Sequence, residues 1–314
     1  MQLSGFYARA RSVAVAFAAL AIAACSPAAE EKPDTGGLPM WVIEDADSTI
    51  YLTGTVHMLP PDVDWRSKKL DKALDDASEL WLELPMPTSQ EAMMKEYGPL
   101  MMRKMFSFNR PLSSLLTEEE KLKLAEAIER AKLPPESAAG LEMMKPWAVS
   151  MMIGMGPLIS SGYDAEEGID INLARLAEEQ DDDIKGFETF EQQMDMLAGG
   201  SEEEQLEGLR AVLNAPPESA DDMQKQSEAA YEGWARGDVK AVEDLVTAMR
   251  SGAGADGMSM EVMLDNRNEN WAGQIEERLK GEGVSFVAVG AAHLVGSKSV
   301  QERLKLRGIE AKPY

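Results

Sequence analysis

Two histidines each lie three residues after a glycine, and this residue type and spacing suggest a functional site. The first motif is Gly54 to His57 (GTVH), and the second is Gly290 to His293 (GAAH). They contain the only two histidines of the 314-residue chain, and each follows an apolar, strand-like run. Because imidazole is a common metal ligand and a base near neutral pH, the pair predicts a metal site or an acid–base site. Two histidines that are satisfied within turns are the alternative.

A glutamate is the third candidate in this site. Glu83 lies at the end of the strand-like run 79–84, and the segment before it predicts a helix over 68–77. The sequence from 49 to 84 therefore predicts a β-α-β unit, whose two strands run parallel and end at the same edge of the sheet. We expect His57 and Glu83 to meet at that edge. An exposed carboxylate at a strand end is the alternative for Glu83.

Two imidazoles and a carboxylate suit a divalent metal that keeps one position open for water. We therefore predict that His57, Glu83 and His293 bind a metal, which would activate water for hydrolysis. Arg267 is expected to stabilise the oxyanion, because a guanidinium group stays charged. No catalytic thiol is expected, because the single cysteine, Cys25, belongs to the N-terminal segment. The chain also lacks the G-x-S-x-G and H-E-x-x-H motifs.

The patterning predicts an α/β fold, with a central mixed β-sheet flanked by helices and a helical insertion at about 89–165. A hairpin is expected from 40 to 53, and further strands are expected at 184–188, 284–289 and 309–314. Helices are expected at 117–132, 168–180, 219–249 and 258–280, with a loop at 199–205. The strand-plus-motif unit occurs twice, which predicts a two-lobed sheet. Glu188 follows a strand just before a helix and is either a site residue or a local hydrogen-bonding group.

Methionine is frequent within the helical insertion. Met93, Met101, Met105 and Met151 are examples. Flexible, polarisable methionine side chains can line a groove that accepts varied apolar ligands. They can equally fill the core of a helical layer, and the sequence leaves both interpretations open.

Several motifs together resemble the TraB/GumN family, which includes the TIKI Wnt-inactivating proteases. The matching stretches run in order along the chain: Gly54 to Pro60, Leu82 to Glu83, Gly168 to Asp170, Glu188 to Gln192, Arg267 to Asn268 with Trp271, and Gly290 to His293. The resemblance implies a fold shared with erythromycin-esterase-like and ChaN-like proteins. It also implies a metal-dependent protease that uses Mn²⁺ or Co²⁺, while Zn²⁺ suits the same ligands.

The resemblance also implies which residues form the site. His57, Glu83 and His293 would be its centre, with Arg267 beside them. Further candidate positions within the matching motifs are Gly54, Asp170, Glu188, Asn268 and Gly290.

The pattern of the N-terminal segment predicts an export signal. Residues 1–24 combine arginines with a short apolar run that ends in small residues before Cys25, which resembles a bacterial lipobox. This predicts cleavage before Cys25, lipidation of its thiol, a tether over 25–37 and a folded domain over 38–314. Ser26 follows the cysteine, and by resemblance to Gram-negative lipoproteins this implies an outer-membrane protein that faces the periplasm. The alternative is an ordinary signal peptide with a stray cysteine.

Charge restricts the class of partner. The net charge is −24, which disfavours nucleic acid and anionic lipid headgroups. We expect a peptide or protein substrate and membrane contact through the lipid anchor alone. The leading hypothesis is a metal-dependent hydrolase, most simply a peptidase. A metal-free esterase-type hydrolase with a histidine base and a non-catalytic binding or signalling lipoprotein are the alternatives.

Overall fold

A computed structural model describes residues 36–85, 87–133, 137–253 and 259–314. The predicted signal peptide and Cys25 lie outside these ranges. None of the helices within them combines the length and apolar character that a bilayer crossing requires.

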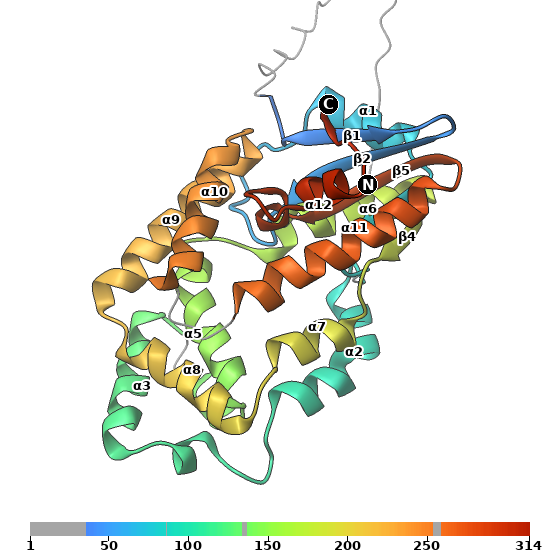
Figure 1. Cartoon of the computed structure of the whole chain (residues 1–314). Helices are drawn as coiled ribbons and strands as arrows, with labels where there is room; N and C mark the ends of the chain where they lie inside the picture. The colour runs from blue at the N-terminus through green and yellow to red at the C-terminus, as the bar shows by residue number, and fades with distance from the viewer. Residues whose placement is uncertain (1–35, 86, 134–136, 254–258) are drawn as a thin grey trace, which may run out of the picture. The chain divides into compact units, whose positions relative to one another are not determined.

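The folded chain is built on a mixed six-stranded sheet within the described ranges, with the order β4-β3-β5-β2-β1-β6 (Figure 1). The strands, in chain order, are β1 (Met40–Glu44), β2 (Ser48–Thr55), β3 (Glu79–Leu82), β4 (Asp183–Gly186), β5 (Gly283–Gly290) and β6 (Lys312–Pro313). The four strands β4, β3, β5 and β2 run parallel, whereas β1 pairs antiparallel with both β2 and β6. The predicted hairpin, the later strands and the edge strand are confirmed.

The order of the strands differs from the expected two-lobed sheet. The two strands that carry the GxxH motifs, β2 and β5, are direct neighbours in one sheet, and Thr55 pairs with Gly290. Strand β5 also separates β2 from β3, so the two strands of the predicted β-α-β unit are parallel but not adjacent. The two-lobed prediction is wrong, because parallel pairing of the two motif-bearing strands buries both of them in a single sheet.

Helices surround this sheet. The first half of the described chain contributes α1 (Lys68–Asp76), α2 (Gln90–Met105), η1 (Leu112–Leu115), α3 (Glu118–Arg130), α4 (Ser137–Leu141), α5 (Pro146–Ser160), η2 (Ala165–Glu167) and α6 (Ile169–Gln180). The second half contributes α7 (Phe190–Leu197), α8 (Glu202–Asn214), α9 (Pro217–Ala235), α10 (Val239–Ala248), η3 (Met249–Ala253), η4 (Glu261–Asp265), α11 (Asn266–Leu279), η5 (Ala291–Leu294) and α12 (Val300–Leu306).

Two local predictions are wrong. The expected loop at 199–205 ends at Ser201, and residues 202–205 begin α8, because Ser201 and Glu204 form a reciprocal capping box. The expected single helix at 219–249 is two helices, α9 and α10. They are separated at Gly237, whose φ of +91° is compatible with glycine and not with a continuing helix.

The apolar side chains separate into a sheet core and helical cores. The largest cluster packs the strands against helices that include α6, α9 and α11. Helices α3, α5 and α8 share a second cluster, and α2, α5 and α7 share a third. In Figure 1, α11 and α12 lie in front of the sheet, and the helices of the second cluster lie below it. The helices of the predicted insertion therefore pack in cores separate from the largest cluster, and they share these cores with α7 and α8, which lie outside the predicted bounds.

Methionines of the insertion divide between the two interpretations that the sequence left open. Met105, Met144 and Met151 pack in the helical cores. Met155 instead lines a cavity beside the motif-bearing strands. Core packing is therefore the role of several methionines in this region, whereas Met94 and Met102 are exposed.

A glycine of the first motif has a packing role. Strand β2 continues past Gly54 to Thr55, so this glycine does not mark a turn out of the sheet. The fully buried indole of Trp234, from α9, lies over this position and donates a 3.0 Å hydrogen bond from Nε1 to the Gly54 carbonyl. A Cβ atom at residue 54 would overlap the indole ring. Glycine is required here for the close approach of a helix and not for a turn.

Candidate active site

Three strand ends bring the predicted residues to one edge of the sheet. His57 follows β2, His293 follows β5 and Glu83 follows β3. Because these strands are parallel and β5 pairs with both of the others, all three C-terminal ends lie together. This is the edge at which ligand sites form in open α/β sheets. The pairing of the strands therefore explains why the two motifs and the glutamate lie at the same edge, as predicted.

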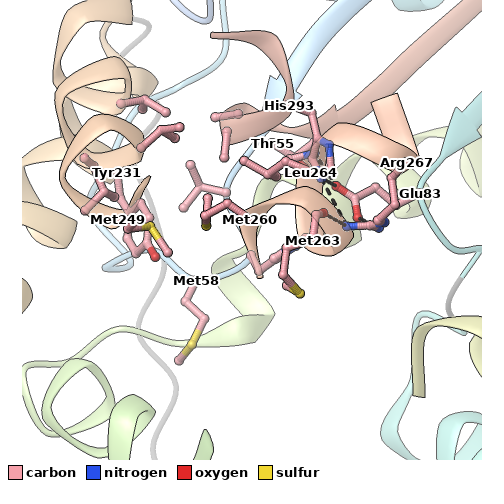
Figure 2. Close-up of a pocket in the computed structure, with 18 of the residues that line it drawn as sticks. Thr55, Met58, Glu83, Tyr231, Met249, Met260, Met263, Leu264, Arg267 and His293 are labelled. Atoms are coloured by element: carbon pink, nitrogen blue, oxygen red, sulfur yellow. Dashed lines mark hydrogen bonds and ion pairs between the residues drawn. The ribbon is translucent and has the colours of Figure 1, made fainter. Parts of the chain in front are cut away.

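Arg267, near the start of α11, is the hub of the cluster (Figure 2). Its guanidinium group donates to both oxygens of Glu188 at 2.8 and 2.9 Å and to Glu83 Oε2 at 2.6 Å. Its Nη1 atom donates to the Met263 carbonyl and to His293 Nε2, each at 3.1 Å. A guanidinium group has five N–H donors, so these contacts occupy all of them.

This geometry changes the role expected for Arg267. A side chain whose donors are all engaged has none left for an oxyanion. We therefore assign Arg267 to positioning, because it holds Glu83 and His293 in fixed relation. Both partner carboxylates are almost fully covered, and such buried charges need a partner of this kind.

The contacts of His293 define its tautomer. Its Nε2 accepts from Arg267, so the proton lies on Nδ1 and is donated to Asn268 Oδ1 at 2.5 Å. Burial lowers the pKa of His293 to about 4, and the ring is therefore neutral at pH 7. Asn268 is in turn held by donation from its amide to the Lys298 carbonyl at 2.8 Å.

Glu83 is ionised despite being buried. Burial alone would raise its pKa, but the neighbouring His293, Arg267 and His57 and a hydrogen bond from the Gly290 amide lower it to about 2. That amide donates to Glu83 Oε1 at 2.6 Å. A Cβ atom at residue 290 would lie 2.8 Å from the same oxygen, so glycine is needed for this contact. Gly290 therefore allows the close approach of a carboxylate, just as Gly54 allows the close approach of an indole ring.

His57 differs from His293 in exposure and charge. Its side chain is 64% exposed, and its Nδ1 lies 3.1 Å from Asp170 Oδ2 at the start of α6. The Asp170 carboxylate outweighs the opposing effect of desolvation and raises the pKa of His57 to about 9. The other oxygen, Asp170 Oδ1, is buried and has no hydrogen-bond partner among the described residues. Because the pair is partly exposed, salt should weaken it.

Trp271 is a site residue that the analysis of ligand types missed. It is fully buried, and its ring lies 4.3 Å from the His293 ring and 4.6 Å from the Arg267 guanidinium. Its Nε1 donates to Glu188 Oε1 at 3.1 Å. The spacing from Arg267 to Trp271 is one helical turn, and this pattern could have identified it as a neighbour. Glu188 thereby belongs to the cluster through Arg267 and Trp271, so its hydrogen bonds are not only local.

Two cavities border the cluster. The larger encloses about 420 Å³ and the smaller about 280 Å³. Thr55, His57 and Glu83 line both of them. Arg267 and His293 line only the larger, whereas Asp170 lines only the smaller. The His57 ring and the Glu83 carboxylate therefore lie where the two cavities meet.

The predicted metal ligands do not form a metal site in this arrangement. Among the residues that the structure describes, no group of three or more His, Cys, Asp or Glu side chains is placed to hold an ion. The guanidinium of Arg267 donates to the single lone pair of His293 Nε2 and to one lone pair of Glu83 Oε2, and its positive charge lies where an ion would bind. His57 Nδ1 faces Asp170 instead of Glu83 and His293. The donor atoms therefore do not fit a divalent ion unless Arg267 moves. Binding of Mn²⁺, Co²⁺ or Zn²⁺ stays a prediction.

Removing the hub should destabilise the fold. We expect Arg267→Met to lower the free energy of unfolding by about 3–5 kcal/mol, because Glu83 and Glu188 would remain buried without their partner. Urea denaturation measures this change. Arg307→Met is the matched control, since Arg307 pairs with Glu269 and Glu276 at the surface and its loss should have little effect. Equal losses in the two variants would contradict the role of Arg267 as a hub.

Comparisons with known proteins agree with the motif pattern. An uncharacterized protein of Treponema pallidum (strain Nichols) is 22% identical over 278 residues, which cover 85% of this chain and 80% of that protein. No solved structure matches the chain. A model of the TraB/PrgY/gumN family matches residues 39–313. This match spans nearly all of the described chain and includes every residue of the cluster, so the protein belongs to the TraB/PrgY/gumN family.

Proposed function

We propose that this protein is a hydrolase that adds water to the carbonyl carbon of an ester, amide or peptide bond. The observation that carries the proposal is the pair of His57 and Asp170, whose histidine ring borders both cavities. Asp170 contacts Nδ1, so Nε2 is the ring nitrogen that can take a proton from water. A substrate that extends into both cavities presents its scissile bond beside this ring.

The reaction needs only groups that the chain supplies. Nε2 of His57 takes a proton from water as the water oxygen bonds to the carbonyl carbon. When the tetrahedral intermediate collapses, the bond to the leaving oxygen or nitrogen breaks, and the imidazolium returns its proton to that atom. Glu83 holds the water, because its oxygens accept from Gly290 and Arg267 and still have lone pairs. Arg267 and His293 keep Glu83 in position.

The protonation of His57 is directly measurable. Only neutral imidazole can act as the base, so activity should rise with pH as His57 loses its proton near pH 9. With two histidines in the chain, proton NMR resolves both titrations. We expect His57 to titrate near pH 9 and His293 to stay neutral down to about pH 4.

Asp170→Asn removes the carboxylate that raises the pKa of His57. The titration of His57 should then move down toward the ordinary value of about 6.5. The control is Glu166→Gln, because Glu166 is a nearby exposed acid that pairs with Arg175 and not with a histidine. A His57 titration that stays in place in Asp170→Asn would remove the basis for the pair.

A metal-dependent peptidase is the second candidate. The two histidines and Glu83 at one edge of the sheet are suitable ligand types and favour it, provided that Arg267 is displaced. When a metal is bound, it would supply an activated water and polarise the carbonyl.

A Co²⁺ titration distinguishes the two candidates. For the metal-free site we expect no absorption band of coordinated Co²⁺ and full activity in excess chelator. Stoichiometric Co²⁺ binding that is lost in His293→Ala, together with inactivation by chelator, would establish the metal-dependent reaction and overturn the first proposal. Carboxylates at the surface bind Co²⁺ only weakly, so His293→Ala is the specific control.

We also propose that the domain is anchored to the outer membrane through lipidated Cys25, as the N-terminal sequence indicates. In a bacterial host that processes lipoproteins, Cys25→Ala should appear in the soluble periplasmic fraction while the unaltered protein remains with the membranes. Retention of Cys25→Ala in the membrane fraction would refute the anchor. Ser26→Ala is the matched control, because it leaves the lipidated thiol in place.

A further inference from the structure

The larger cavity has a strongly uneven lining. Its polar end consists of His57, Glu83, Arg267 and His293, while the remainder is almost entirely apolar. Five methionines contribute to the apolar part, namely Met58, Met155, Met249, Met260 and Met263. Figure 2 shows Glu83, Arg267 and His293 at one side of the pocket, and Met249 and Tyr231 at the other.

The apolar wall comes from segments that are far apart in the sequence. Met58 follows β2, Met155 comes from α5, Met249 begins η3, and Met260 and Met263 lie next to and within η4. Methionine side chains are unbranched and flexible, so they adapt to a flexible apolar ligand better than rigid side chains do. A volume of about 420 Å³ lies within the range of small-molecule sites. The cavity therefore suits a long apolar group attached to one polar head.

We propose that the larger cavity binds a linear acyl chain, with its carbonyl carbon at the polar end between His57 and Glu83. The substrate is then an acyl ester or acyl amide, and its leaving group occupies the smaller cavity beside Asp170 and Gln193. This inference rests on the proposed hydrolase function and names the substrate class. In the reaction, water adds to the acyl carbon, the acyl–oxygen or acyl–nitrogen bond breaks, and a fatty acid and an alcohol or amine are released.

Chain length is the variable that tests this assignment. We propose to measure hydrolysis of p-nitrophenyl acetate, butyrate, octanoate, dodecanoate and hexadecanoate. Each methylene group buried in the cavity should raise kcat/KM about fourfold, which is the equivalent of about 0.8 kcal/mol. The rise should end in an optimum once the chain reaches the far wall. A flat series, or a preference for bulky aromatic acyl groups, would overturn the proposal.

Filling the far end of the cavity should shorten the preferred chain. Met249 is half-buried in that wall, so Met249→Trp should lower the ratio of kcat/KM for dodecanoate to that for butyrate at least tenfold. Met260→Phe tests the same wall independently, in case the first variant does not fold. Met94→Trp is the matched control, because Met94 is 52% exposed on α2 and should leave the ratio unchanged. An unchanged ratio in both folded cavity variants would contradict the proposal.

Binding separates this inference from the proposed function. In His57→Ala, which lacks the base, fatty acids of the same lengths should displace a fluorescent fatty acid with affinity that increases with chain length. Such binding without any hydrolysis by the unaltered protein would retain the acyl site and refute the hydrolase. Hydrolysis that is independent of chain length, together with no fatty-acid binding, would retain the hydrolase and refute the acyl site.

Discussion

The pairing of Arg267 with two buried carboxylates is the interaction on which the rest of the site depends. Removing Glu83 and Glu188 from water costs several kcal/mol for each ion unless the charges are compensated. The guanidinium compensates both and uses its remaining donors on His293 and the Met263 carbonyl. The Trp271 ring lies close to the guanidinium and excludes solvent on that side. A cluster held in this way is rigid, and within it His57 alone is both largely exposed and titratable near neutral or alkaline pH.

The two histidines therefore have different surroundings, although their motifs look alike. His293 is buried, neutral and hydrogen-bonded through both ring nitrogens, so it cannot readily exchange a proton with a substrate. His57 has one nitrogen on Asp170 and an exposed ring. In the proposed reaction the first motif therefore supplies the base, and the second motif stabilises the Glu83 carboxylate. The backbone amide of Gly290 contributes directly to that stabilisation.

The two glutamates of the β3 segment lie at opposite ends of the strand and have different surroundings. Glu79 and Glu83 flank the apolar residues 80–82, and both have a pKa lowered to about 2 against the effect of burial. Glu79 lies at the N-terminal end of the strand, where Lys185, Arg278 and Ser285 hold its oxygens. It borders neither cavity among those described. Glu83 lies at the C-terminal end and lines both cavities, so of the two glutamates only Glu83 faces the space where a ligand could bind.

Local sequence patterns predict most of the elements and the edge of the sheet at which the candidate residues lie. Capping boxes, the hairpin and the strand-like runs before each GxxH motif depend on neighbours within a few residues, and such local chemistry can be interpreted without a structure. Parallel strands then place His57, Glu83 and His293 at one edge, whichever order the strands adopt. The order itself, with β5 between β2 and β3, depends on how the sheet is buried as a whole.

The contacts of these residues, in contrast, depend on how distant parts of the chain pack together. Arg267 and Glu83 are 184 positions apart, and the contact between them results from packing α11 against the sheet edge. Together with its bonds to Glu188, His293 and the Met263 carbonyl, that contact engages every donor of Arg267, and the bond to His293 occupies the Nε2 lone pair that a metal would need. The lining of the larger cavity likewise comes from seven separate segments, and no periodicity in any one of them indicates it. Short-range hydrogen bonding and hydrophobic spacing encode the elements, whereas side-chain contacts across the fold exist only after the chain has packed.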